Sequence, residues 1–181
     1  MATDSQAPGE LELVRAFLNT YDVEEDVDEI ATPAQLADWL ADHELPTARS
    51  PSAADVGRAA ATREALRSLV LANNGEPLDP AAVETLNDVA SGARLFVRFE
   101  ADGGSVLSPQ SRGVEEALGV LLGIVFRAMA EGTWSRLKAC RDDTCQWAFY
   151  DRSKNRSATW CSMRVCGNRA KARNYRRRHA S

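Results

Sequence analysis

The four cysteines of this 181-residue chain fall into two matched pairs near its C-terminus. Their spacing is Cys140-x4-Cys145-x15-Cys161-x4-Cys166. A tetrahedral zinc ion takes four cysteine thiolates, and two short pairs joined by a stretch long enough to form a strand and return supply that geometry. The pattern therefore predicts one structural zinc ion held by all four cysteines. No coordination position is left open, so we expect no catalytic role for the metal.

Three other interpretations of the cysteines have less support. Two disulfides are disfavoured, because the N-terminal MATDSQAPGE lacks the basic and apolar segments of a secretory signal, and cytosolic proteins rarely hold disulfides. An iron–sulfur cluster also uses four cysteines, and four unrelated buried thiols would leave the pairing unexplained. We expect a cytoplasmic protein without a membrane partner, since no apolar run approaches the roughly 18–20 residues that span a bilayer.

Charge is divided unevenly along the chain, although the net charge is only −4. Residues 136–181 carry 13 Lys/Arg against 3 Asp/Glu, a net charge of +10. Residues 1–135 carry 9 against 23, a net charge of −14. Such a division predicts an anionic partner for the basic part and marks a module boundary. We predict an acidic domain over residues 1–134 and a basic zinc finger over residues 135–181.

The basic residues are predicted to lie on a helix from Gly167 to His179 and on the loop before it. At 100° per residue, four arginines share one stripe of that helix: Arg169, Arg173, Arg176 and Arg177. Guanidinium groups make bidentate, charge-assisted contacts with phosphate, which favours nucleic-acid binding. The predicted nucleic-acid contacts are the basic residues of the loop and the helix: Arg152, Lys154, Arg156, Arg169, Lys171, Arg173, Arg176, Arg177 and Arg178.

Other interpretations of this basic surface stay open at the level of sequence. It could be a solvated helix face, or it could dock on an acidic surface of this chain or of a partner protein. RNA binding shares the same charge argument, but Trp160 and the aromatic segment 146–151 are too few for a stacking platform. Asn168 would either cap the helix or reach a base edge, and His179 is expected to be a tail residue.

The acidic part is predicted to be mostly helical. Helix starts and apolar stripes predict five helices, over the approximate ranges 11–21, 32–40, 52–75, 79–92 and 113–131. The last of these is apolar almost all round, which predicts a place at the centre of the core. Leu95, Val97 and Phe99 alternate as in a half-buried strand, and Asp102-Gly103-Gly104 marks a turn to a returning strand over 105–108.

The predicted fold class is therefore α+β. A mostly helical N-terminal domain with a small antiparallel β-hairpin precedes a small four-cysteine zinc finger, which contains a strand over 146–151 and the basic C-terminal helix. The finger is too small to bury much core by itself, so metal binding is expected to carry much of its folding energy.

Nothing in the acidic part predicts catalysis, and we expect no enzyme. The sequence has neither a glycine-rich phosphate loop nor a cysteine nucleophile there. His43 is expected to be a solvated loop residue. The acidic run 24–29 lacks the spacing of a calcium loop and is expected to be a solvated turn. Asn19-Thr20 is expected to end the first helix as a polar turn.

Both parts of the chain resemble known families. The C-terminal part resembles the CGNR zinc finger in Trp160-Cys161-Ser162-Met163, in Cys166-Gly167-Asn168-Arg169-Ala170-Lys171, and in most of the run from Cys140 to Ser157. The N-terminal part resembles the ABATE domain that usually precedes that finger, through Phe17-Leu18-Asn19-Thr20 and Leu36-Ala37-Asp38-Trp39-Leu40.

This resemblance implies a bacterial, stress-associated transcription regulator. The four family cysteines carry over to the zinc ligands already predicted: Cys140, Cys145, Cys161 and Cys166. The finger would bind DNA, chiefly through phosphates, while the N-terminal domain would sense a partner or a small-molecule effector. Neither the target site nor the oligomeric state follows from the sequence.

Overall fold

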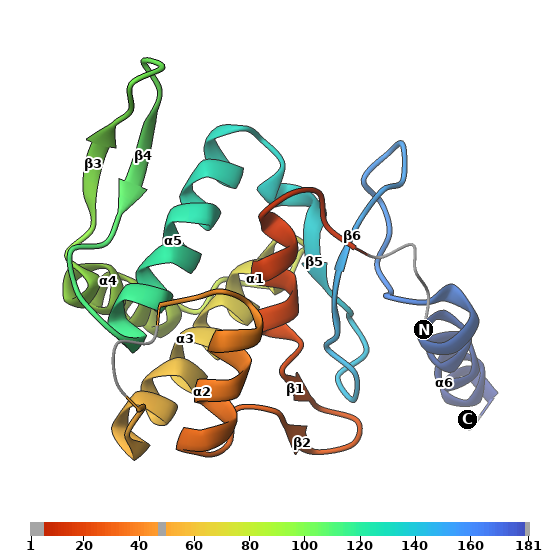
Figure 1. The fold of residues 1–181 in the computed structure, drawn as a ribbon. Helices are drawn as coiled ribbons and strands as arrows, with labels where there is room; N and C mark the ends of the chain where they lie inside the picture. Colours follow the sequence, from red (N-terminus) through yellow and green to blue (C-terminus); the bar gives the residue numbers. More distant parts are fainter. Residues whose placement is uncertain (1–5, 47–49, 180–181) are drawn as a thin grey trace.

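The structure is a computed structural model and describes residues 6–46 and 50–179. Within that part the α-helices are α1 Leu11–Leu18, α2 Pro33–Asp42, α3 Ala53–Ala72, α4 Pro80–Ala93, α5 Val114–Ala130 and α6 Asn168–His179 (Figure 1). The strands form three antiparallel pairs: β1 Tyr21–Asp22 with β2 Val27–Asp28, β3 Phe96–Phe99 with β4 Ser105–Ser108, and β5 Leu137–Ala139 with β6 Ala148–Tyr150. The predicted α+β fold is confirmed.

Helix α5 lies at the centre of the core, as its composition predicts. It packs against α1, α3, α4 and β4, and Leu118 and Leu121 on it are almost completely buried. Its glycines let neighbours approach closely: a Cβ on Gly119 would lie 2.8 Å from the Cβ atoms of Ala93 and Pro109. In the part of the chain that the structure describes, no helix is long and apolar enough to cross a membrane.

Side-chain caps set the helix starts that the sequence predicts. The Thr32 hydroxyl accepts a hydrogen bond from the Gln35 amide at the start of α2, and Ser52 with Asp55 forms a capping box at the start of α3. Helix α1 ends at Leu18, so the predicted stripe does not reach Tyr21, but the prediction that Asn19-Thr20 ends the helix as a polar turn is confirmed. Asn19 caps the helix, and the chain turns into β1.

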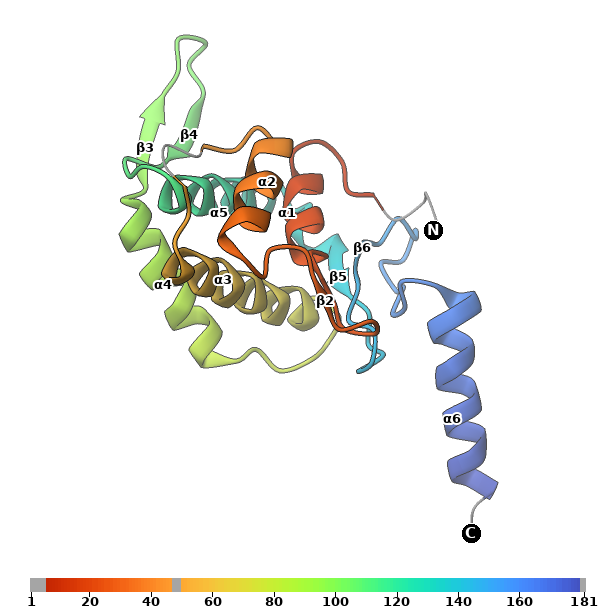
Figure 2. The ribbon, with the colours of Figure 1, turned by 60° about the horizontal axis from the view of Figure 1, so that its bottom comes forward.

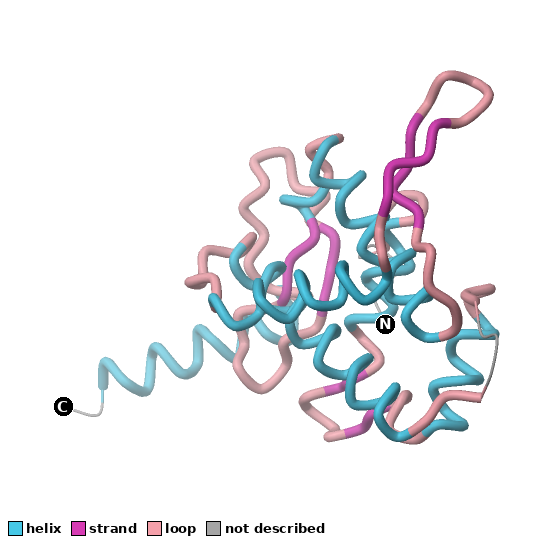
Figure 3. Tube along the Cα trace, turned by 90° about the vertical axis from the view of Figure 1, so that its left-hand side faces the viewer, coloured by secondary structure: helices cyan, strands magenta, loops and turns pink. Residues whose placement is uncertain are grey.

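The β3–β4 hairpin has the predicted strands, but its predicted burial is wrong. All four residues of β3 are exposed. The hairpin extends beyond the helices (Figure 1), and it is β4 that packs against α5. Seen from another side, the hairpin and α6 project in different directions from the body (Figure 3). The alternation that predicts one buried face thus marks a face that none of residues 6–46 and 50–179 covers.

The base of the zinc finger belongs to the same core as the helices. Leu137, Ala139 and Ala148 in the β5–β6 hairpin are completely buried, and they join the core cluster that contains the apolar residues of α1, α3 and α5. Strand β5 packs on α3 and strand β6 on α1. The finger therefore draws stability from the helical body as well as from its metal.

Candidate metal centre and nucleic-acid interface

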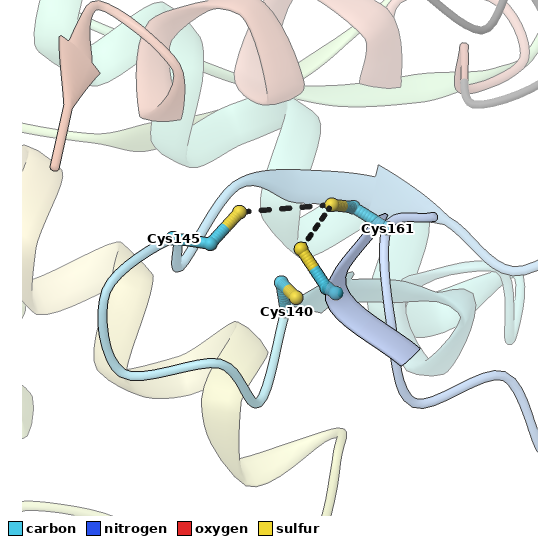
Figure 4. Close-up of side chains that lie close together, drawn as sticks. Cys140, Cys145 and Cys161 are labelled. Atoms are coloured by element: carbon cyan, nitrogen blue, oxygen red, sulfur yellow. Dashed lines mark hydrogen bonds between the residues drawn. The ribbon is translucent and has the colours of Figure 1, made fainter. Parts of the chain in front are cut away.

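The sulfur atoms of Cys140, Cys145, Cys161 and Cys166 converge on one point. All four lie within 4.8 Å of one another. Figure 4 shows the labelled side chains of Cys140, Cys145 and Cys161 around a common centre. The Cys161 sulfur is 3.6 Å from that of Cys145 and 3.7 Å from that of Cys166. A zinc ion with Zn–S bonds of about 2.3 Å has tetrahedral sulfur edges of about 3.8 Å, so this donor set fits one zinc ion.

These distances exclude the disulfide interpretation. The four cysteines are free, and a disulfide would bring two sulfur atoms to about 2.05 Å. Four thiolates complete the tetrahedral coordination of zinc, as in structural sites. The prediction of one structural zinc ion is thereby confirmed.

The close approach of the sulfur atoms shifts the cysteine pKa values in opposite directions. Hydrogen bonds from Cys145 and Cys161 hold the pKa of Cys140 far below its usual value, at about 2. The Cys140 thiolate in turn raises the pKa of Cys145 to about 12 and also raises the pKa of Cys161. One negative charge is thus accommodated easily and further ones are not. A bound zinc ion supplies the charge that lets all four ionise, with release of protons.

Asp142 organises the loop between the first two cysteines. Its backbone carbonyl accepts hydrogen bonds from the amides of Cys145 and Gln146, and its carboxylate accepts from the hydroxyl of Thr144. The carboxylate is buried and also pairs with Arg173 of α6 at 3.2 Å. Burial would raise the pKa of Asp142, but the hydrogen bonds from Arg173 and Thr144 outweigh it and the pKa is lowered. Asp142 therefore connects the metal loop to the basic helix.

Lys138 and Asp151 hold the loop that follows β6. Both side chains are buried, and the Lys138 ammonium donates to the Asp151 carboxylate at 2.8 Å. The same ammonium donates to the carbonyls of Arg156 at 2.6 Å and Ala158 at 3.1 Å. The Asp151 carboxylate also accepts from the amides of Ser153 and Ala158. These bonds fix the loop that presents Arg152, Lys154 and Arg156.

Polar side chains of the helical body attach the finger at several points. The Asn73 amide donates to the carbonyls of Trp134 and Leu137, and the Asn74 amide to those of Ala139 and Thr159. The Asn19 side chain donates a hydrogen bond to the Ala148 carbonyl and accepts one from the Ala148 amide, as a neighbouring strand would. Arg67, almost completely buried, donates to the carbonyls of Leu18 and Gln146. These positioning residues were not predicted from the sequence, apart from Asn19, which was predicted as part of a turn.

Helix α6 follows the last cysteine, as predicted, through a π-helical turn at Met163–Gly167. It extends away from the body (Figure 2). Beyond Ala170 every side chain that the structure describes is exposed. Asn168 is exposed, and its side-chain amide donates to the Arg164 carbonyl at 3.0 Å, a contact with the preceding π-helical turn.

The predicted arginine stripe begins against the body and ends in solvent. Arg169 pairs with Glu24 of the β1–β2 turn at 2.5 Å, while Arg173 pairs with Asp142. The hydrogen bond from Arg169 lowers the pKa of Glu24. Arg176, nearer the C-terminus, has its guanidinium against the Ala172 carbonyl of its own helix. The i, i+4 spacing therefore places the first two arginines on one side, and that side faces acidic residues.

The basic residues of the loop form a group separate from the helix. Arg152 lies over the Tyr150 ring and donates to the Gln6 carbonyl, and Lys154 and Arg156 are exposed. The loop and the far end of α6 extend in different directions from the finger (Figures 1 and 2). The structure thus divides the predicted nucleic-acid residues into two groups, one on the loop after β6 and one on α6.

Two expectations for the acidic part need correction. His43 is half-buried: it stacks on the Trp39 ring at 4.1 Å and contacts the Trp39 carbonyl. The acidic run 24–29 is more than a solvated turn, because Glu24 pairs with Arg169 and Asp28 accepts a bidentate contact from the buried Arg63. Burial would raise the pKa of Asp28, but the Arg63 contact lowers it overall.

Comparison with known proteins gives two matches along the chain. Residues 136–179 match the CGNR zinc finger. Residues 11–132 match the ABATE family, which is described as a putative stress-induced transcription regulator. No curated protein matches the chain significantly. Since the second match covers more than half of the sequence, the chain belongs to the ABATE family, and a CGNR zinc finger forms its C-terminal part.

Proposed function

We propose that this protein is a transcription regulator that binds DNA through α6 and the loop after β6, with the acidic domain as its regulatory module. The observation that carries the proposal is the exposure of α6. This helix holds six Lys/Arg and no acidic residue, and it extends from the body beyond Ala170. A helix that is polar all round gains little from packing on its own protein.

The dimensions and chemistry of α6 suit duplex DNA. An α-helix fits the major groove, and arginines along it contact phosphates and base edges. The zinc ion, when bound, supplies a fixed anchor at Cys166, directly before the helix. The loop held by Lys138 presents Arg152, Lys154 and Arg156 as further phosphate contacts. Thiolate ligands stay reduced in a cytoplasm, which is where such a regulator would act.

The salt dependence of binding tests this proposal. If about five phosphates are neutralised, log K should fall with log salt concentration at a slope near −4.5. Arg176→Ala should reduce the magnitude of this slope by roughly 0.9, because one phosphate contact is lost. Fluorescence anisotropy with a labelled DNA duplex at several salt concentrations measures both. Arg112→Ala, at an exposed arginine before α5, is the control and should leave the slope unchanged.

A slope near zero, or no binding at low salt, would contradict the proposal. An equal effect from Arg112→Ala would show that net charge rather than α6 controls the binding. A parallel site selection from DNA and RNA pools decides between the two nucleic acids, since both share the electrostatic contribution.

The second candidate function is that of a protein-interaction module, and the Arg169–Glu24 pair favours it. This contact shows that the basic helix already engages carboxylates at its base. In the interaction module, acidic residues of a partner protein would continue that contact along α6. In the DNA-binding regulator, Glu24 instead competes with phosphate for Arg169, which gives the acidic domain a means of lowering DNA affinity.

Glu24→Gln tests whether Glu24 competes with phosphate for Arg169 or only positions α6. If Glu24 competes with phosphate, the variant is expected to bind DNA several-fold more tightly at low salt, because Arg169 is released and one repulsive charge is removed. Glu25→Gln, the same charge change one residue away, is the control and should have the smaller effect. Anisotropy titrations measure both variants. Unchanged or weaker binding by Glu24→Gln would mean that the pair only positions α6.

A further inference from the structure

We propose that a second copy of this chain covers the β3–β4 hairpin and the adjoining C-terminal half of α5, so that the protein is a homodimer through this face. The proposal concerns assembly and goes beyond DNA binding. It starts from a place where the sequence predicts burial and the structure shows exposure.

The hairpin presents an apolar face that the described part of the chain leaves uncovered. Val97 and Phe99 point to the same side, because side chains alternate along a strand, and Leu107 lies opposite Val97 in the register. Val97 is 56% exposed and Phe99 is 81% exposed. Alternation of this kind is the pattern of a strand with one buried face, so the pattern is complete only when another surface covers it.

Helix α5 packs against this hairpin and adds two exposed apolar side chains near it. A Cβ on Gly123 would lie 2.8 Å from the Leu107 carbonyl oxygen, so the hairpin backbone rests directly on this turn of the helix. Phe126 lies three residues beyond Gly123 and Met129 three residues further, so the two are neighbours on the exposed C-terminal half of α5. They are 57% and 45% exposed. Together with Val97 and Phe99 they form what we call the hairpin face.

The hairpin is placed firmly enough to serve as a contact surface. The Gly123 contact requires the absence of a side chain, and four residue pairs connect the strands. An isolated two-stranded hairpin is only marginally stable in water, and its outer strand β3 leaves an edge that invites pairing. Contact with another copy would stabilise both the face and this edge.

Area and charge point to a second copy as the occupant. On a scale of roughly 200 Å² for a large apolar side chain, two copies of the hairpin face remove about 1,000 Å² from water, the lower end of specific interfaces. The charges beside it are already paired, Arg98 with Glu100 and Arg127 with Glu10. A two-fold dimer brings identical surfaces together, so the acidic body or the basic finger would repel its own copy there, whereas the paired charges beside the hairpin face would not.

Sedimentation equilibrium of the full-length, zinc-loaded protein from 1 to 100 µM tests this inference. The wild type should fit a monomer–dimer equilibrium in this range. Phe99→Glu should raise the dimer dissociation constant roughly 30-fold or more, as loss of a central aromatic contact does. Leu78→Glu is the matched control: it places the same charge at an exposed apolar residue outside the hairpin face and should leave the constant unchanged.

Zinc content and circular dichroism of each variant show that it is folded, and both should equal those of the wild type. A monomeric wild type at 100 µM would overturn the proposal. So would a dimer that Phe99→Glu and Leu78→Glu weaken equally or not at all. A photo-crosslinker at position 99 locates the contact: crosslinks to residues 96–130 of another copy support it, and crosslinks to the finger contradict it. DNA is absent throughout, so the outcome is independent of the proposed function.

Discussion

A Cys161→Ser variant is expected to lose the zinc ion. Without the metal, the cysteine loops and α6 are expected to lose their ordered structure. Cys161 lies between two other ligands, with its sulfur 3.6 Å and 3.7 Å from theirs. It is only half-buried, so serine costs little in packing and the effect reports the metal. Structural zinc contributes about 10–16 kcal/mol of apparent binding free energy in finger peptides. Even a fraction of this amount exceeds what most single substitutions cost.

The loss of structure should be confined to the cysteine loops and α6. The cysteine loops and α6 have the metal as their main support, whereas Leu137 and Ala148 sit in the core of the helical body. We therefore expect faster amide hydrogen exchange over residues 140–147 and 158–179, while α5 stays protected. Wild-type protein should bind one zinc ion per chain, and a chelator should give it the exchange pattern of the variant.

Two controls make this result specific. Ser157→Ala, a change of similar size on the exposed loop of the same finger, should retain the zinc. Added zinc should restore the chelated wild type and leave Cys161→Ser unchanged. A variant that keeps its zinc and its melting temperature would show that three cysteines suffice. Loss of protection throughout α5 would show that body and finger fold as one unit.

The metal site was predictable because all of its information is local. Two cysteine pairs and the residues between them define the donor set. The arginine-rich segment after Cys166 is predicted to be a helix from its own residues alone. Helix caps such as Thr32 and Ser52 are equally local, since donor and acceptor lie three residues apart. These elements could be assigned from the sequence because their structure depends on neighbouring residues and not on distant segments.

The contacts that α3 makes with the β1–β2 turn and with the finger were not predictable, because the residues that make them resemble surface residues. Arg63 and Arg67 on a helix are expected to be solvated, yet both are buried. Their partners, Asp28 and the carbonyls of Leu18 and Gln146, come from segments far away in sequence. Only the tertiary arrangement brings them together. The same holds for Glu24 and Arg169, whose pairing no spacing rule indicates.

The hairpin shows the opposite case, in which a sequence pattern predicts burial that the structure of one chain does not show. Alternation at Val97 and Phe99 indicates a covered face, and the structure leaves both residues exposed. A pattern of burial describes the functional assembly, whereas a single chain shows only its own contacts. The disagreement is therefore informative, and it is the basis of the proposed dimer.

Lys138→Met is expected to lower the free energy of unfolding by about 3–5 kcal/mol, because it leaves the Asp151 carboxylate buried without its cation. The Asp151 side chain is fully buried and that of Lys138 nearly so. The carbonyls of Arg156 and Ala158 lose their donor as well, which releases the loop that presents the basic residues. Urea denaturation of both proteins at pH 7 measures the difference. Lys154→Met, at an exposed lysine of the same loop, is the control and should change stability by no more than about 0.5 kcal/mol.

The pH dependence of this difference identifies its cause. Burial would raise the pKa of Asp151, but the hydrogen bonds from Lys138 and Ser153 outweigh it, so the pKa in the folded wild type lies below its ordinary value. A lowered pKa contributes stability above the unfolded pKa of about 3.9 and loses it as the pH falls through the folded value. Without Lys138, burial dominates, so in the variant the pKa should instead lie above its ordinary value.

The variant should therefore regain stability relative to the wild type as the pH falls from 7 toward 4, because protonation removes the buried charge. A difference that stays constant over this range would mean that lost packing, and not the unpaired carboxylate, destabilises the variant. In that case Lys138 would act mainly through its contacts with the loop carbonyls, and Asp151→Asn would be expected to cost little.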